Sequence, residues 1–99
     1  MVFTFAETDP ISTYLFAFLA GKFTKVTRER DSRGITMYHR ETDQEKISTN
    51  LDIIFNQHFG AIEWLENYTG IPLPFGQFEF VATPSFQYGG MEHPGAILY

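Results

Sequence analysis

The chain has 99 residues, enough for one small domain and too few for a two-domain enzyme. Hydrophobic residues make up 43% and aromatic residues 17%, so a packed core is expected and intrinsic disorder is not. A net charge of -5 disfavours nucleic acid as a partner, and the absence of cysteine excludes disulfides, thiolate zinc sites and cysteine nucleophiles.

The first third of the chain predicts three strands. Val2 to Glu7 alternates Phe with polar residues and indicates a short strand. Thr13 to Thr27 is apolar on both alternating faces in its first half, which predicts one central strand with a solvated end. The polar cluster Arg28 to Gly34 is typical of a turn, and Ile35 to Arg40 then predicts the returning strand of a hairpin.

A long amphipathic helix follows. Thr42 and Glu45 have the spacing of a capping box, which predicts the helix start. The helix should end near Tyr68, because Gly70 suits a left-handed C-cap and Pro72 cannot continue the hydrogen-bond ladder. Apolar positions then recur at intervals of three and four, at Ile47, Leu51, Ile54, Phe55, His58, Ile62 and Leu65.

The last third predicts two further strands, Gln77 to Thr83 and Ala96 to Tyr99. The order of elements gives an α+β fold, a mixed or antiparallel sheet with one long amphipathic helix on one face. No second helix is available for the opposite face, and a strand reaches the C-terminus in pattern. We therefore expect that the chain was excised from something larger and that the uncovered face is a domain junction.

No membrane span or targeting segment is expected. The longest apolar run, Tyr14 to Ala20, is far shorter than the roughly 20 residues that cross a bilayer, and no Lys or Arg precedes Lys22 to form the start of a signal peptide. The pattern leaves the compartment open between the cytoplasm and the periplasm or exterior.

The histidines and paired acids favour structural roles. His39, His58 and His93 do not have the spacing that brings zinc ligands to one face of a helix, so no metal site is predicted. His58 lies in the apolar stripe of the helix, where a hydrogen-bonded His at the core edge is the simplest interpretation, and His39 is interpreted in the same way. Glu63 and Glu66 are interpreted as surface charge.

The segment between the last two predicted strands combines paired glycines with a carboxylate. Gly89 and Gly90 have no Cβ, so the backbone of a ligand could approach them closely. Glu92 could meet a cation at the edge of the sheet. Composition alone predicts only a turn here, so a binding site and a plain connection are both open.

At these residues the sequence resembles a known family. Tyr88 to Gly95 reads Tyr-Gly-Gly-Met-Glu-His-Pro-Gly and closely resembles the G-x-M-E-N exopeptidase signature of the gluzincin zinc aminopeptidases, which include alanyl aminopeptidase (aminopeptidase N) and leukotriene hydrolase. Pro10 to Phe18 resembles that family's P-x-S-T-Y-L-x-A-F strand, and Pro72 to Phe80 resembles the stretch before its signature. Nearly all of the chain aligns in order.

The resemblance implies a place in a larger enzyme. Residues 1–10 would be the tail of a preceding N-terminal β domain. Residues 11–99 would be the N-terminal sheet subdomain of a thermolysin-like catalytic domain, truncated before the zinc-binding helix. The parent would be a metalloprotease that removes N-terminal residues from peptides.

The resemblance also implies roles for individual residues. Glu92 would bind the free α-ammonium group of a peptide substrate, and Gly89 and Gly90 would hold its backbone. Met91 would pack behind the glycines, and Tyr88 would form a wall of the pocket for the first side chain. A carboxylate at a fixed distance from the scissile bond would select substrates with a free amino terminus.

The chain departs from the family pattern in two ways. His93 stands where the family usually carries Asn, and an imidazole reproduces only some of the hydrogen bonds of an amide. The H-E-x-x-H helix and the distal Glu ligand do not occur in the chain. The resemblance therefore implies zinc in the parent, none bound by this fragment, and no catalysis by the fragment alone.

Two alternatives remain open from the sequence. The chain could be a stand-alone peptide-binding or protein-binding module without catalysis, in which the aromatic sheet face and the loop from Tyr88 to Gly95 contact a partner. The isolated piece could also bury its uncovered face by self-association, without a physiological role.

Overall fold

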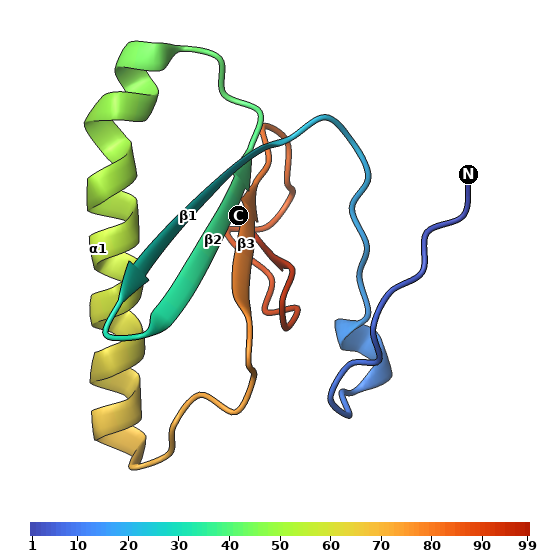
Figure 1. Cartoon of the computed structure of the whole chain (residues 1–99), viewed down its shortest axis with the longest axis vertical. Coiled ribbons are helices and arrows are strands. Elements are labelled where there is room, and N and C mark those ends of the chain that lie inside the picture. The colour runs from blue at the N-terminus through green and yellow to red at the C-terminus, as the bar shows by residue number, and fades with distance from the viewer.

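In the computed structural model, which describes residues 1–99, one long helix lies along one face of a four-stranded sheet (Figure 1). The strands lie side by side in chain order, with β1 and β2 antiparallel and the pairs β2–β3 and β3–β4 parallel. This confirms the α+β class and shows that the sheet is mixed. The elements are a 3₁₀ turn η1 (Thr13–Leu15), β1 (Thr24–Arg30), β2 (Arg33–His39), α1 (Gln44–Thr69), β3 (Phe78–Ala82) and β4 (Ile97–Leu98).

The predicted hairpin is present, but its turn is much shorter than expected. Asp31 and Ser32 alone connect β1 to β2, and both have positive φ, at 50° and 65°. Positive φ at both central residues is the conformation of the two-residue turns that match the twist of a hairpin. The prediction that Arg28 to Gly34 is all turn is therefore wrong, because Arg30 pairs with Arg33 within the ladder.

The charged end of β1 is held against the helix. The guanidinium of Arg28 lies over the ring of Phe55 (5.6 Å), and that of Arg30 lies over the ring of Phe59 (4.7 Å). Arginine can cover an aromatic ring with its planar head while keeping contact with water. Polar side chains therefore line a strand whose inner face packs on α1.

The prediction of one central strand from Thr13 to Thr27 is wrong. Residues 13–15 form the 3₁₀ turn, residues 16–23 have no regular structure, and the strand begins only at Thr24, at the edge of the sheet. A run that is apolar on both faces needs cover on both faces, which an edge position does not supply. Phe16 and Phe18 remain 72% and 77% exposed.

The prediction of a strand from Val2 to Glu7 is also wrong. These residues have no regular structure, and all ten residues from Met1 to Pro10 are exposed. The N-terminal segment runs on the side of the sheet opposite α1 and joins no strand of it (Figure 1). Without a neighbouring strand, the backbone groups of an extended segment have no ladder partners, so alternation alone did not make a strand.

The N-cap of helix α1 lies one residue later than predicted. The side chain of Asp43 accepts hydrogen bonds from the backbone N–H groups of Glu45 and Lys46 (both 3.1 Å), so Asp43, not Thr42, is the N-cap. A carboxylate is a strong acceptor and also complements the positive end of the helix dipole. The end is as predicted, since Gly70 is the C-cap with φ of 69°.

The core lies between α1 and the middle of the sheet. Ile35 is 0% and Phe80 1% exposed, and the two lie on adjacent central strands. The ring of Phe55 contacts that of Phe80, with centroids 6.1 Å apart. The buried cluster consists of Ile35, Met37, Phe55, Phe59, Ile62 and Phe80.

His58 confirms the prediction of a hydrogen-bonded histidine at the core edge. Its Nδ1 lies 2.8 Å from the carbonyl oxygen of Ile54, which requires the proton on Nδ1, and its Nε2 lies 3.3 Å from the hydroxyl of Tyr99. Its ring stacks on Phe80 with centroids 4.1 Å apart. The imidazole thus packs as a flat, partly polar core residue.

His39 differs from its predicted state. It is 3% exposed, yet neither ring nitrogen has a hydrogen-bond partner. Strand alternation places it on the same face as Ile35 and Met37, where the packed neighbours are largely apolar. Its position in the strand, not a polar partner, explains why it is buried.

Glu66 is a structural contact, not the free surface charge that was predicted. Its Oε1 accepts hydrogen bonds from Arg33 at the start of β2 (2.7 Å) and from the backbone N–H of Leu73 (2.7 Å). The hydrogen bond from Arg33, and then that from Leu73, lower the pKa of Glu66. The carboxylate joins the last turn of α1 to the hairpin and to the connection that leads into β3.

No helix of the structure combines the length and the apolar character required to cross a lipid bilayer.

Candidate functional site

The segment that the sequence singled out connects β3 to β4 and is fixed to the sheet at both ends. Tyr99 N–H donates to the carbonyl of Val81, and Thr83 N–H donates to the carbonyl of Tyr99 (both 3.0 Å). Met91 and Leu98 exchange backbone hydrogen bonds of 2.9 and 3.1 Å in an antiparallel bridge. The chain therefore folds back along β4, and Met91 extends the free edge of the sheet.

The two glycines of this segment have different surroundings. A Cβ built on Gly90 would lie 3.3 Å from Cδ1 of Tyr99 and 3.4 Å from the carbonyl oxygen of Leu98. A Cβ built on Gly89 would have no atom within 4 Å. Neither glycine has a positive φ. Gly90 therefore allows the segment to lie close to β4, whereas Gly89 faces open space at the edge.

Glu92 lies on the surface directly after the bridge. Its side chain is exposed, and its Oε1 accepts a hydrogen bond from the hydroxyl of Tyr14 at 3.3 Å. No cation of the chain pairs with it, since the ion pairs are Arg33–Glu66 and Lys46–Glu41. The carboxylate is thus held at one oxygen and free at the other.

His93, which stands where the family usually carries Asn, makes a separate contact with the residue after Tyr14. Its Nδ1 lies 3.0 Å from the carbonyl oxygen of Leu15, so the ring donates a hydrogen bond there. Its own carbonyl accepts from Ala96 N–H (3.0 Å) across a turn in which Gly95 has φ of 72°. An imidazole N–H supplies here a donor of the kind that an amide would also offer.

Tyr88 and Met91 differ in exposure. Tyr88 is 63% exposed, and its ring meets that of Phe86 edge-on, with centroids 5.9 Å apart. Met91 is half-buried beside β4. The structure therefore brings Tyr88, Gly89, Gly90, Met91, Glu92 and His93 together along one sheet edge, with Met91 inward and Tyr88 and Glu92 outward.

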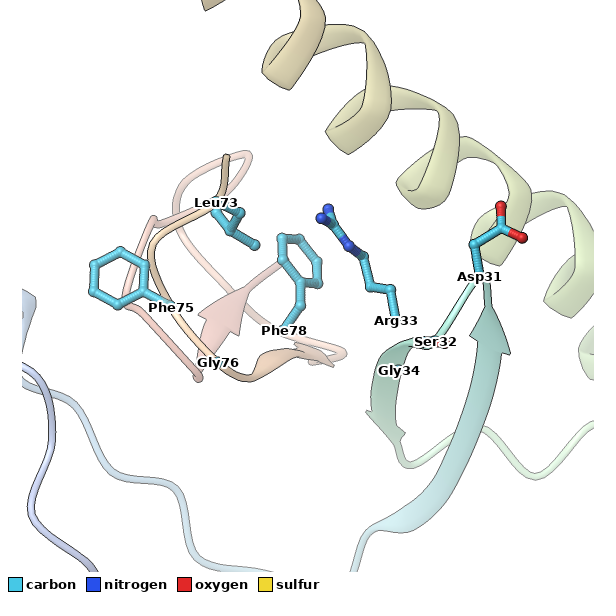
Figure 2. A pocket seen from close by; sticks show the side chains of 8 residues that line it. All are labelled: Asp31, Ser32, Arg33, Gly34, Leu73, Phe75, Gly76 and Phe78. Atoms are coloured by element: carbon cyan, nitrogen blue, oxygen red, sulfur yellow. The ribbon is translucent and has the colours of Figure 1, made fainter. Parts of the chain in front are cut away.

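Two cavities of the molecule lie away from this edge. One of about 280 Å³ is at the turn of the hairpin, where the side chain of Arg33 extends between Asp31 and the apolar Leu73 and Phe78 (Figure 2). The other, of about 590 Å³, lies between the first half of α1 and the ends of β2 and β3, beside His39. Residues 88–93 line neither cavity. The candidate site is an open edge.

Tyr14 is a site residue that the sequence did not reveal. The predicted central strand from Thr13 to Thr27 included Tyr14, whereas the 3₁₀ turn presents its hydroxyl to Glu92. The two residues are 78 positions apart, and no local pattern connects them. Only the family-like P-x-S-T-Y-L stretch could have marked this segment as notable.

The residues of this chain do not fit a resident metal ion. No three side chains of the ligand-forming types His, Cys, Asp and Glu come together in a group. The three histidines lie in separate places, His39 in the core, His58 on α1 and His93 in the segment between β3 and β4. Any zinc chemistry would need ligands from outside these residues.

The curated proteins described below, to which the chain is similar, are aminopeptidases. No protein-family model matches the chain. Aminopeptidase N of Plutella xylostella is 33% identical over 98 residues, which are 96% of this chain and 10% of that protein. Leucyl aminopeptidase of Saccharolobus solfataricus is 31% identical over 99 residues, 100% of this chain and 12% of that protein.

A vertebrate relative likewise matches nearly all of this chain with a small part of its own length. Glutamyl aminopeptidase of Bos taurus is 30% identical over 96 residues, which are 97% of this chain and 10% of the relative. The chain thus spans about a tenth of the length of these curated relatives and matches one continuous segment of each.

Proposed function

We propose that this chain forms the part of an M1-family aminopeptidase that binds the amino terminus of a peptide. The premise is that nearly the whole length of the chain matches one segment of such enzymes. Residues 1–10 would be the tail of a preceding β domain, and residues 11–99 the sheet subdomain of a thermolysin-like catalytic domain. Zinc and its ligands would come from the remaining catalytic domain. The chain alone would not hydrolyse peptides.

The observation that carries the proposal is the position of Glu92 at the sheet edge. Its carboxylate is exposed, unpaired by any cation and bound at only one oxygen. A peptide ammonium group is a cation with three N–H donors, and a carboxylate is its natural acceptor. The resulting charge-assisted hydrogen bond is worth roughly 1.5–3 kcal/mol. Peptides with a blocked amino terminus would lose it.

In this proposal, Gly89 and Gly90 hold the backbone of the peptide beside the Glu92 carboxylate. An extended peptide can add to a free sheet edge through main-chain hydrogen bonds, and bulky side chains on that edge would obstruct it. Gly89, whose missing side chain would point into open space, leaves such room. In this arrangement Tyr88 contacts the first side chain of the peptide, and Met91 supports the glycines from behind.

The proposal is tested with Glu92→Gln in the full-length enzyme. The amide keeps the shape but removes the charge, so KM for an aminoacyl p-nitroanilide should rise and kcat should fall, with kcat/KM about 10- to 100-fold lower. Glu63→Gln, which changes an exposed carboxylate on α1, is the matched control and should leave both constants unchanged. Near-normal kcat/KM in the Glu92 variant would refute the amine-binding role.

A further inference from the structure

The loop that carries Glu92, residues 88–95 (the edge loop), is hydrogen-bonded at two successive residues to the N-terminal segment, residues 1–23. The Tyr14 hydroxyl donates to Oε1 of Glu92 (3.3 Å), and Nδ1 of His93 donates to the carbonyl of Leu15 (3.0 Å). Residue 14 is thus hydrogen-bonded to residue 92, and residue 15 to residue 93. Each of the two hydrogen bonds joins residues 78 positions apart.

The local structure of the N-terminal segment creates this pair of contacts. Leu15 N–H donates to the carbonyl of Ser12 (2.9 Å), and Phe16 N–H donates to that of Thr13 (3.2 Å). These bonds close the turn η1, whose carbonyl groups at Ser12 and Thr13 are used within the turn. The side chain of Tyr14 and the carbonyl of Leu15 take no part in these bonds, and both are bound by the loop.

We infer that Tyr14 is a positioning residue that holds the carboxylate of Glu92 in one orientation for a primary ammonium group, an inference that rests on the proposed function. The hydroxyl occupies Oε1, and Oε2 has no hydrogen bond within the chain. A free Glu side chain populates many rotamers, and freezing them on binding weakens binding. A carboxylate that is already held at one oxygen presents the other without that loss.

The exposure of Tyr14 supports a role for its hydroxyl over a role in packing. The residue is 60% exposed, so the ring is not placed there by burial in the core. Tyr68 on α1 offers a contrast, because it is 76% exposed, its ring stacks on Trp64 with centroids 5.1 Å apart, and its hydroxyl has no hydrogen bond. Tyr68→Phe is therefore a matched control for removing a hydroxyl from an exposed tyrosine.

The experiment measures competitive inhibition of the full-length enzyme by leucinamide and by 4-methylpentanamide, the same molecule without its amine. Tyr14→Phe should raise the inhibition constant of leucinamide about three- to tenfold, because it removes one hydrogen bond to a charged group at an exposed site. The constant for 4-methylpentanamide should not change. Tyr68→Phe should change neither, and the melting temperatures of both variants should stay at that of the wild type.

The double variant with Glu92→Gln separates positioning from an independent effect. If Tyr14 acts through Glu92, adding Tyr14→Phe to Glu92→Gln should produce no further loss of leucinamide binding. An additive loss would overturn the inference, as would an equal weakening of both inhibitors.

The outcomes also distinguish this inference from the proposed function. If Glu92→Gln weakens leucinamide and Tyr14→Phe does not, the inference is wrong and the amine-binding role of Glu92 stands. If Glu92→Gln leaves leucinamide binding unchanged, the proposed function fails and the positioning role fails with it.

Discussion

Phenylalanine residues in two regions of the molecule behave in opposite ways. Between α1 and the sheet, Phe55 and Phe80 are 2% and 1% exposed, whereas in the N-terminal segment Phe5 and Phe18 are 83% and 77% exposed. The hydrophobicity of phenylalanine is the same in both. The difference is that β2, β3 and α1 cover each other's apolar side chains, whereas the rings of Phe5 and Phe18 have no such cover within the chain. Apolar pattern predicts burial only where a partner surface exists.

The largest effect that would test this contrast is a truncation in the core. Phe80 contacts Phe55, His58 and Tyr99, so Phe80→Ala should lower the free energy of unfolding by about 3–5 kcal/mol. Phe18→Ala should change it by less than about 0.5 kcal/mol, because its ring is exposed. Urea unfolding of the 99-residue chain measures both. Equal losses would mean that the N-terminal segment packs as tightly as the core.

A smaller effect separates the two glycines of the edge loop. Gly90→Ala should lower the free energy of unfolding by about 1 kcal/mol, because its Cβ would crowd Tyr99 and the carbonyl of Leu98. Gly89→Ala should leave stability within about 0.5 kcal/mol of the wild type. Under the proposed function, Gly89→Ala in the full-length enzyme should nevertheless raise KM for a peptide substrate. Loss of stability at Gly89 without a change in KM would assign it a folding role alone.

The smallest effect concerns the charged start of α1. The hydrogen bond from Lys46, and then those from the backbone N–H groups of Asp43 and Thr42, lower the pKa of Glu41 from 4.5 to about 2. A carboxyl with a lowered folded-state pKa stabilises the fold above its unfolded pKa and loses that contribution as pH falls. The contribution of Glu41 should therefore be complete above pH 4.5 and disappear as the pH approaches 2.

The measurement for this effect is the pH titration of the Glu41 carboxyl by NMR. In Lys46→Met the strongest of these hydrogen bonds is missing, so the pKa of Glu41 should rise towards 4.5. The variant should also unfold with a shallower dependence of stability on pH between 4.5 and 2. A Glu41 pKa that stays near 2 in Lys46→Met would show that the backbone N–H groups alone hold it down.

Local pattern was sufficient for the central elements of the fold. The three- and four-residue spacing from Ile47 to Leu65 and the glycine at position 70 predicted α1, because helix periodicity and the C-cap depend on residues that are close in sequence. The alternation around Phe80 predicted β3 for the same reason. The glycines and the acid of the edge loop were also visible as a candidate site, although their role stays a proposal.

Other features depended on partners that local pattern does not name. Thr13 to Thr27 had the composition of a buried strand, but only the segment from Thr24 paired with β2. Thr42 had the spacing of a cap, but Asp43 offered the stronger acceptor to the same helix end. Pairing with β2 decided where the strand begins, whereas the N-cap was decided locally, by the hydrogen bonds that the Asp43 side chain accepts from Glu45 and Lys46.

By itself, the sequence determined the class of the fold, the long helix, the order of the hairpin and strands, and a family resemblance that nearly the whole chain carries. The tertiary structure alone decided that Tyr14 meets Glu92, that His93 binds Leu15, and that Glu66 joins the helix to Arg33. The physical reason is the range of the interactions. Helix and strand patterns reflect hydrogen bonds and packing between near neighbours, whereas these contacts exist only after the core has brought distant segments together.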